Sequence, residues 1–373
     1  MTQDQYHHYI PRFILKGFAD VTLPRLGARK DHHIIKVYGV RDETLTMADV
    51  SRAYGIMNMY RDLGLDDYMH FEKLLGKLES SSAVFVHAIR SGSKDLLLKR
   101  VDLVNFKKFL AIMMYRHENR RRQYVEDMFD PLTRVSVQRH MRSNNIGTIQ
   151  EVWLENLKGI LQTSVDDIFN AAMTIIQDQN RLRGLLAYKG RIHSTELLEV
   201  EDMISNYVCI WQAQEGSEFI ITDNCFGCFE GHNGVNFHNF FVVSPQYAVV
   251  LVNRLYMWGG MEQLPLRTSW FGEELHANPD CDYIKKGVQS FEDYDPNDVF
   301  KYRRIIVPKD KVWLVNSIFL DARHKHITYR SAVGMIKTLA YYDKHKRALF
   351  PNSHDYSALK RHLAAEINRT HAL

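Results

Sequence analysis

Tyr207-Val208-Cys209-Ile210-Trp211-Gln212-Ala213-Gln214 is the stretch at which this 373-residue chain changes from a helical to an extended pattern. It is rich in β-branched and aromatic residues, which favour strands. Three more runs of this kind follow at 219–222, 237–243 and 247–253, with turn residues between them. The pattern predicts a block of mostly antiparallel strands that begins after Asn206.

The chain before this block has the period of amphipathic helices. From Asp67 onward, apolar side chains recur three and four residues apart, as on a helix with one buried face. Asp102 is the predicted N-cap of a second helix. Further helical patterns cover 152–160, 165–180 and 194–205. A strand pair at 34–38 and 44–60 precedes the helices, and a strand at 304–307 and a helix at 309–329 follow the strand block.

Strands and helices that do not alternate favour an α+β fold, with a helical block packed beside a mostly antiparallel sheet, over a doubly wound α/β fold. We expect a single domain over 1–373, since no linker composition interrupts the chain. Its parts are an N-terminal docking segment with strands (1–66), a helical block (67–205), a β-rich block (206–308) with a long acidic loop (259–298), and C-terminal helices (309–373).

The composition is that of an ordinary globular protein, with 45% hydrophobic and 25% charged residues and a net charge of +4. The charge is uneven: residues 90–142 carry 13 Lys/Arg against 6 Asp/Glu, and residues 271–298 carry 8 Asp/Glu against 2 Lys. These segments form either a basic and an acidic face or a pair that attract each other within the fold. The polar start without an apolar stretch, and the lack of a membrane-length apolar run, predict a soluble cytoplasmic or nuclear protein with no signal peptide or transmembrane segment.

Two motifs distinguish the sequence: His8-Tyr9-Ile10-Pro11-Arg12-Phe13 near the start, and Phe219-Ile220-Ile221-Thr222-Asp223-Asn224 in the strand block. These motifs resemble domain-of-unknown-function family 4238, in its fungal-like branch. The resemblance extends to Val243-Ser244-Pro245 and to the late segment from Val315-Asn316 to Thr328-Tyr329-Arg330-Ser331. The usual family pattern places Pro-Val after the Asp-Asn pair, where this chain has Cys225-Phe226. The resemblance implies no particular reaction.

The first motif offers a candidate acid or base. In an extended segment the imidazoles of His7 and His8 point to opposite faces, so only one of them enters a site. We predict that His8 is the one, acting as general acid/base because a histidine titrates near neutrality. The alternative is a structural histidine that is hydrogen-bonded at both nitrogens.

Arg116 is the candidate anion-binding residue. It lies two turns after Phe109 on the stripe that also holds Met113, so its guanidinium, and that of Arg120, continue a buried face. A buried guanidinium needs a carboxylate or an anionic ligand. Asp223 or Glu79 could supply the carboxylate, and a phosphate or carboxylate ligand is the functional alternative.

The second motif ends in Asp223-Asn224, at the mouth of a strand. Asp223 could orient His8, and Asn224 could bind a polar group of a ligand. The alternative is that both residues only form a turn, in which their side chains hydrogen-bond the nearby backbone. Asn316 is a weaker ligand-binding candidate, because an amide among apolar neighbours needs buried partners.

Metal and cofactor chemistry is not expected. Cys225 and Cys228, with His232 and His238, have the residue types of a zinc site, but the second Cys-x-x-Cys pair is missing. Nucleotide-binding glycine motifs and the common hydrolase motifs are also missing from the sequence.

Two functions remain. The first is a hydrolase or nuclease-like enzyme acting on a phosphate-containing substrate, with His8 as acid/base, Asp223 orienting it and Arg116 holding the anion. The second is a non-enzymatic binding or interaction protein in which the same cluster is structural. The candidate partners are an anionic ligand and, with weaker support, nucleic acid; the oligomeric state is not determined by the sequence. An open pocket around His8, Arg116 and Asp223 would favour the enzyme, and a dry, fully paired cluster the binding protein.

Overall fold

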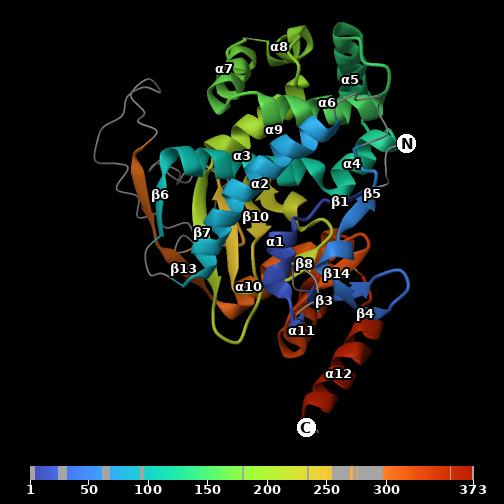
Figure 1. Cartoon of the computed structure of the whole chain (residues 1–373). Helices are drawn as coiled ribbons and strands as arrows, with labels where there is room; N and C mark the ends of the chain where they lie inside the picture. Colours follow the sequence, from blue (N-terminus) through green and yellow to red (C-terminus); the bar gives the residue numbers. More distant parts are fainter. Residues whose placement is uncertain are drawn as a thin grey trace.

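The computed structural model describes residues 5–23, 32–60, 68–92, 96–178, 180–232, 235–253, 269–271, 275, 297–352 and 354–371. It has an α+β fold, in which a helical block lies against mostly antiparallel sheets (Figure 1). The helical block is made of α2 (Tyr68–Arg90), α3 (Arg100–Arg116), α4 (Glu118–Val125), α5 (Pro131–Asn144), α6 (Ile149–Gln162), α7 (Val165–Ile176), α8 (Arg181–Ala187) and α9 (Ser194–Ser205).

Local capping explains where several of these helices begin. Asp130 accepts the amides of Leu132 and Thr133 at the start of α5, and Thr148 forms a reciprocal capping box with Glu151 at the start of α6. The predicted cap at Asp102 is wrong, because α3 begins two residues earlier, after Lys99. Asp102 instead lies in the first helical turn, where a carboxylate still interacts favourably with the helix dipole.

The main sheet has the strand order β13-β7-β11-β10-β9. All its pairs are antiparallel except the edge pair β13–β7, which is parallel. Its central strands are almost completely buried, which explains why they appear in the sequence as nearly continuous apolar runs. The strands are β7 (Tyr207–Ala213), β9 (Phe229–His232), β10 (Val235–Val242), β11 (Tyr247–Val252) and β13 (Arg304–Val307).

A second sheet has the order β2-β3-β14-β8, with β4 paired to β3. Its strands are β2 (Val21–Leu23), β3 (His32–Gly39), β4 (Leu45–Asp49), β8 (Ile221–Thr222) and β14 (His326–Thr328). The predicted helix at 309–329 is therefore wrong over its last seven residues, 323–329. α10 (Lys309–Ala322) ends seven residues earlier, and the chain turns into β14.

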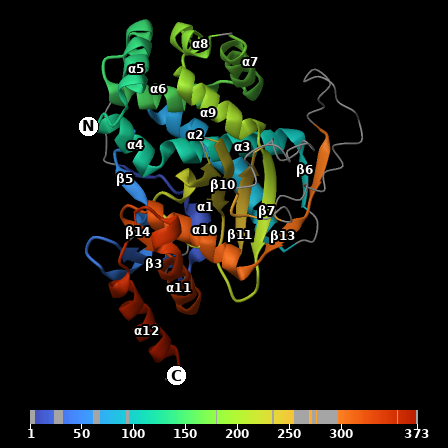
Figure 2. The same cartoon turned by 180° about the vertical axis from the view of Figure 1, so that it is seen from behind.

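Two short ribbons complete the strands: β1 (Tyr6–His8) with β5 (Gly55–Met57), and β6 (Leu96–Lys99) with β12 (Val299–Tyr302). The C-terminal helices α11 (Ala332–Leu349) and α12 (Ser357–His371) follow β14, and the end of α12 projects away from the body (Figures 1 and 2). Among the described residues, no helix is both long and apolar enough to span a membrane.

The N-terminal segment docks into the core, as its apolar residues predict. After β1 it forms α1 (Arg12–Leu15) and a 3-10 turn (Lys16–Phe18), and Ile14, Leu15 and Phe18 are fully buried. Arg90 of α2 fixes this segment: its Nη1 donates to the carbonyl of Phe13 at 2.8 Å, and its Nε donates to the carbonyl of Val243 at 2.9 Å. One side chain thus joins the N-terminus, the helical block and the strand block.

Cations of the basic segment 90–142 bind inside the fold. Lys108 Nζ donates to the carbonyls of Leu161 at 3.0 Å and Thr163 at 2.6 Å, at the end of α6. Arg100 pairs at 2.8 Å with Asp298, the last residue of the predicted acidic loop. Most of that loop, 259–298, lies outside the described residues, so its predicted role stays a prediction.

Candidate functional site

His8 and His7 lie on opposite sides of β1, but the inward residue is His7. The His7 side chain is 5% exposed, its Nε2 lies 3.8 Å from Glu72 Oε1, and its ring packs on Tyr60 with 5.0 Å between centroids. His8 is half-buried. The two imidazoles point to opposite faces, as predicted, and His7 is the more buried because β1 pairs with β5 and turns its His7 side toward Tyr60 and α2. The choice of His8 as the site residue stays a prediction.

The imidazole of His8 contacts the protein backbone. Its Nε2 lies 3.0 Å from the carbonyl of Val50, so this nitrogen carries the proton and donates it. Burial lowers the pKa of His8 to about 4; the Val50 carbonyl opposes this shift, and the positive charges of Arg12 and Arg116 add to it. His8 is therefore neutral at physiological pH.

Arg116 lies in the core at 1% exposure and is ion-paired. Its Nη2 lies 2.8 Å from Glu79 Oε1 on the neighbouring helix α2, and its Nε donates to the carbonyl of Tyr9 at 3.2 Å. Of the two carboxylates considered from the sequence, the structure brings Glu79 to Arg116. Glu72 is a second nearby carboxylate, and burial raises its pKa while the charge of Arg116 opposes the rise.

Asp223 is completely buried and holds a turn. Its Oδ1 accepts the backbone amides of His324 at 3.2 Å, Lys325 at 3.0 Å and His326 at 2.9 Å, and its Oδ2 accepts Lys325 N at 3.0 Å. These bonds fix the turn that leads from α10 into β14. β1 pairs with β5 and β8 pairs with β14, so the His8 segment and the Asp223 strand are not paired strands. The His8 segment still lies near Asp223: burial raises the pKa of Tyr9, and the charge of Asp223 adds to the rise.

Asn224 belongs to a second buried contact. Its Nδ2 donates to the carbonyl of Ala322 at 2.7 Å, and its side chain is hydrogen-bonded to His117. The Nδ1 of His117 accepts the backbone amide of Arg120 at 3.4 Å and so caps α4. Burial lowers the pKa of His117 to about 3, with the Arg120 charge adding to the effect, so this histidine too stays neutral.

Asn316 lies apart from these residues, on α10. Its Oδ1 accepts the amide of Ile220 at 3.1 Å, and its Nδ2 donates to the carbonyl of Glu218 at 2.8 Å and to Thr338 Oγ1 at 3.1 Å. The Asn316 amide thus has the buried partners that its apolar neighbours in the sequence led us to expect. All its contacts join α10 and α11 to the segment before β8.

Cys225 and Cys228 are buried free thiols in and after the 3-10 turn Cys225–Gly227. Burial raises the pKa of both, so neither is a ready thiolate ligand. His238 is hydrogen-bonded at 2.8 Å to Glu230, on the adjacent strand. Within the described ranges, no group of three or more metal-binding side chains is found.

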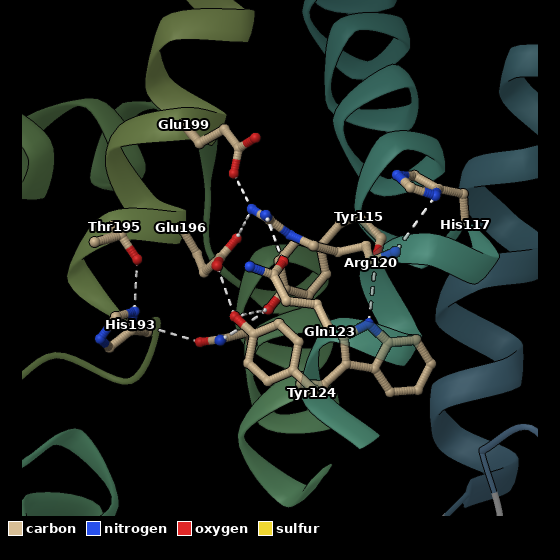
Figure 3. A network of polar contacts seen from close by, with 11 residues as sticks. Tyr115, His117, Arg120, Gln123, Tyr124, His193, Thr195, Glu196 and Glu199 are labelled. Carbon is tan, nitrogen blue, oxygen red and sulfur yellow. Dashed lines mark hydrogen bonds and ion pairs between the residues drawn. The ribbon is translucent and has the colours of Figure 1, made fainter. Parts of the chain in front are cut away.

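A polar network lies around Arg120, in the first turn of α4 (Figure 3). The Arg120 guanidinium lies between two carboxylates of α9: its Nη2 lies 2.5 Å from Glu196, and Glu199 is a second ion-pair partner. Tyr124 donates to Glu196 at 2.6 Å, and Tyr115 donates to Tyr124 at 2.9 Å.

This network continues to a buried histidine. Asn156 Nδ2 donates to the hydroxyl of Tyr115 at 2.9 Å, and its Oδ1 accepts the amide of His193 at 2.7 Å (Figure 3). The ring of His193 bonds Ser136 and Thr195, and burial lowers its pKa. These groups join α3, α4, α5, α6 and α9, so the network organises the helical block.

Sequence reasoning found only part of this network. Helical phase placed Arg120 on a continuation of the helix that holds Arg116, whereas the helix ends at Arg116 and Arg120 lies on the next helix, α4, where it is half-buried. Its partners were missed because Glu196 and Glu199 are more than seventy residues away. A usable signal was the spacing of Glu196 and Glu199, one turn apart on a helix whose apolar face contacts α3.

The candidate residues therefore form neighbouring, internally bonded clusters, since the charge of Arg116 acts on His8 and the charge of Asp223 acts on Tyr9. His8, Arg116 with Glu79, Asp223 with Asn224, and Asn316 each bond backbone or side-chain groups of the chain itself. They connect elements distant in sequence and satisfy polar groups that would otherwise be costly to bury.

A family model described as Protein of unknown function (DUF4238) matches residues 6–332. The comparisons found no match among curated proteins or solved structures.

Proposed function

The chain belongs to the DUF4238 family, and we propose that it works by binding a partner rather than by hydrolysing a phosphate ester. In this proposal the His8, Arg116 and Asp223 motifs hold the N-terminal segment, the helical block and the sheets together. The function itself resides on the surface of the assembled protein.

The observation that carries the proposal is the bonding of Asp223. A carboxylate that orients a catalytic histidine accepts a hydrogen bond from the imidazole N–H. Both oxygens of Asp223 accept backbone amides of the turn at 324–326, and the His8 ring bonds the Val50 carbonyl. Arg116 is similarly engaged, since it is paired with Glu79 and bonded to Tyr9.

The pKa of His8 also argues against acid/base catalysis. A general acid or base works best when its pKa lies near the working pH. With the pKa of His8 lowered to about 4 by burial, only about one ring in a thousand is protonated at pH 7. As a base, the same ring is about two and a half pKa units weaker than an ordinary histidine.

A hydrolysis assay with matched variants tests the proposal. Wild-type protein, His8→Gln and the exposed control His87→Gln are incubated with p-nitrophenyl phosphate, bis(p-nitrophenyl) phosphate, and single-stranded RNA and DNA. We expect no turnover that depends on His8. Turnover that His8→Gln removes and His87→Gln retains, with all three proteins melting alike, would overturn the proposal and support the hydrolase.

A further inference from the structure

We infer that the outward face of α5 and the adjacent hollow beside α8 form a docking surface for an acidic amphipathic helix of a partner protein. The inference rests on the proposed binding function and names the place and chemistry of the contact. It uses residues outside all the clusters described above.

The outward face of α5 is apolar at its start and basic at its end. Leu132 is 74% exposed and Val135 is 54% exposed, and Arg139 and Arg142 follow in the same line and are also exposed. Spacings of three and four residues place all four on one side of the helix. Val137 and His140 are buried on the opposite side, so this orientation is fixed by packing.

The apolar part extends beyond the helix. Met128, in the loop before α5, is 59% exposed, and Val125, at the end of α4, is 42% exposed. Single exposed apolar residues are common on protein surfaces, whereas a run of them along one edge marks an interaction site. Val125, Met128, Leu132 and Val135 lie within 11 positions of sequence, from the end of α4 through the connection into the first turns of α5.

A hollow of about 310 Å³ lies at the basic end of this line, between α5 and α8. Leu186 and Ala187 give it an apolar lining, and Arg139, Asn180 and Arg183 add polar groups. Arg183 is 74% exposed and pairs with Asp178 at 3.3 Å, a surface ion pair of the kind that contributes little and exchanges readily. Arg139 has no carboxylate partner within the described part of the chain, and its Nη1 lies 3.5 Å from the Leu186 carbonyl.

Charge complementarity identifies the occupant. Leu132 and Arg139 are seven residues apart, which is about 10 Å along a helix. A partner helix with apolar side chains every three or four residues and Asp or Glu about two turns further on matches this spacing. The acidic residues Glu126, Asp127 and Asp130 flank the apolar end, so the carboxylates of the partner helix are expected at the opposite end, beside Arg139.

Peptide selection tests this assignment without assuming the partner. A phage-displayed library of random 16-residue peptides is selected on wild-type protein, and enriched sequences are synthesised with a fluorescein label. We expect peptides with apolar residues at helical spacing followed by Asp or Glu. Anisotropy titrations should show binding at least tenfold weaker to Val135→Asp and to Arg139→Glu, and unchanged binding to the exposed α2 control Val84→Asp.

Other outcomes contradict the inference. It fails if no such sequences are enriched, or if the peptides bind Val135→Asp as tightly as wild type. It also fails if Val135→Asp abolishes self-association in sedimentation velocity, or binding to phosphatidylserine vesicles, while no peptide binds; the surface would then meet a second copy or a membrane. The hydrolysis assay is a separate measurement, so failure of the docking surface leaves the proposed function standing, and failure of the proposed function is recognised by His8-dependent turnover in that assay.

Discussion

Replacing Arg116 by alanine should destabilise the protein by about 3 kcal/mol, because it breaks one side of a buried ion pair. Arg116 is 1% exposed and pairs with Glu79 at 2.8 Å, while its Nε satisfies the Tyr9 carbonyl. Breaking such a pair typically costs about 3–5 kcal/mol. The Glu79 side chain is 27% exposed and can regain hydration, which places the expected value at the low end of that range.

Urea unfolding followed by tryptophan fluorescence measures this cost. Arg116→Lys should recover little of the lost stability, because an ammonium cannot reproduce a guanidinium bonded to Glu79 and Tyr9 at once. The double variant with Glu79→Ala should show a coupling energy of about 1–3 kcal/mol. Arg122→Ala is the control, because its pair with Glu126 and its contact with His324 lie near the surface, where such interactions contribute little to stability.

The reasoning is refuted if Arg116→Ala changes the unfolding free energy by less than about 1 kcal/mol, or if the two substitutions are additive. A ligand-binding arginine in a solvated pocket would give that pattern, with ligand binding lost instead. A result of that kind would return Arg116 to the functional site predicted from the sequence.

Three further predictions follow from buried groups. Burial raises the pKa of Glu218 to about 7, above its unfolded value, so wild-type stability should fall as the pH rises from about 4.5 to 7. Thermal melts at pH 5, 6 and 8 should show a weaker dependence of stability on pH for Glu218→Gln than for the wild type. The same dependence in both proteins would contradict this prediction. Deleting residues 1–18 should give an insoluble protein or one that melts without cooperativity, because the segment fills the core. An unchanged cooperative melt of the truncated protein would show that the core does not need this segment. Elemental analysis should find no stoichiometric zinc, because Cys225 and Cys228 are buried thiols. A chelator should also leave the melting temperature unchanged. Stoichiometric zinc whose removal lowers the melting temperature would show that the two cysteines are zinc ligands.

Local patterns in the sequence predicted most of the fold. The helical period located α2, α3, α6, α7 and α9, and the apolar runs located β3, β7, β10, β11 and β13. These signals are reliable because period and burial are linked within a few residues of chain. The docking of the N-terminal segment was predictable for the same reason.

What the sequence could not predict depends on distant partners. The break between α10 and β14 is stabilised by Asp223, about one hundred residues earlier, so the local pattern continued as helix. Which of the two side chains, His7 or His8, faces the core depends on the pairing of β1 with β5. Helical phase predicted the burial of Arg116, and only the packing of α2 on α3 identified Glu79 as its partner.

The most direct test of the structural role assigned to these motifs is hydrogen exchange on Asp223→Asn. This change replaces one acceptor oxygen with an N–H₂ group: in the place of Oδ1 it removes the bonds of all three amides to that atom, and in the place of Oδ2 it removes one of the two bonds of Lys325 N. We predict that the amides of His324, Lys325 and His326 lose protection and that the unfolding free energy falls by about 2–4 kcal/mol. Unchanged protection and stability, together with loss of a phosphate-ester turnover present in the wild type, would contradict the account and make Asp223 a catalytic residue.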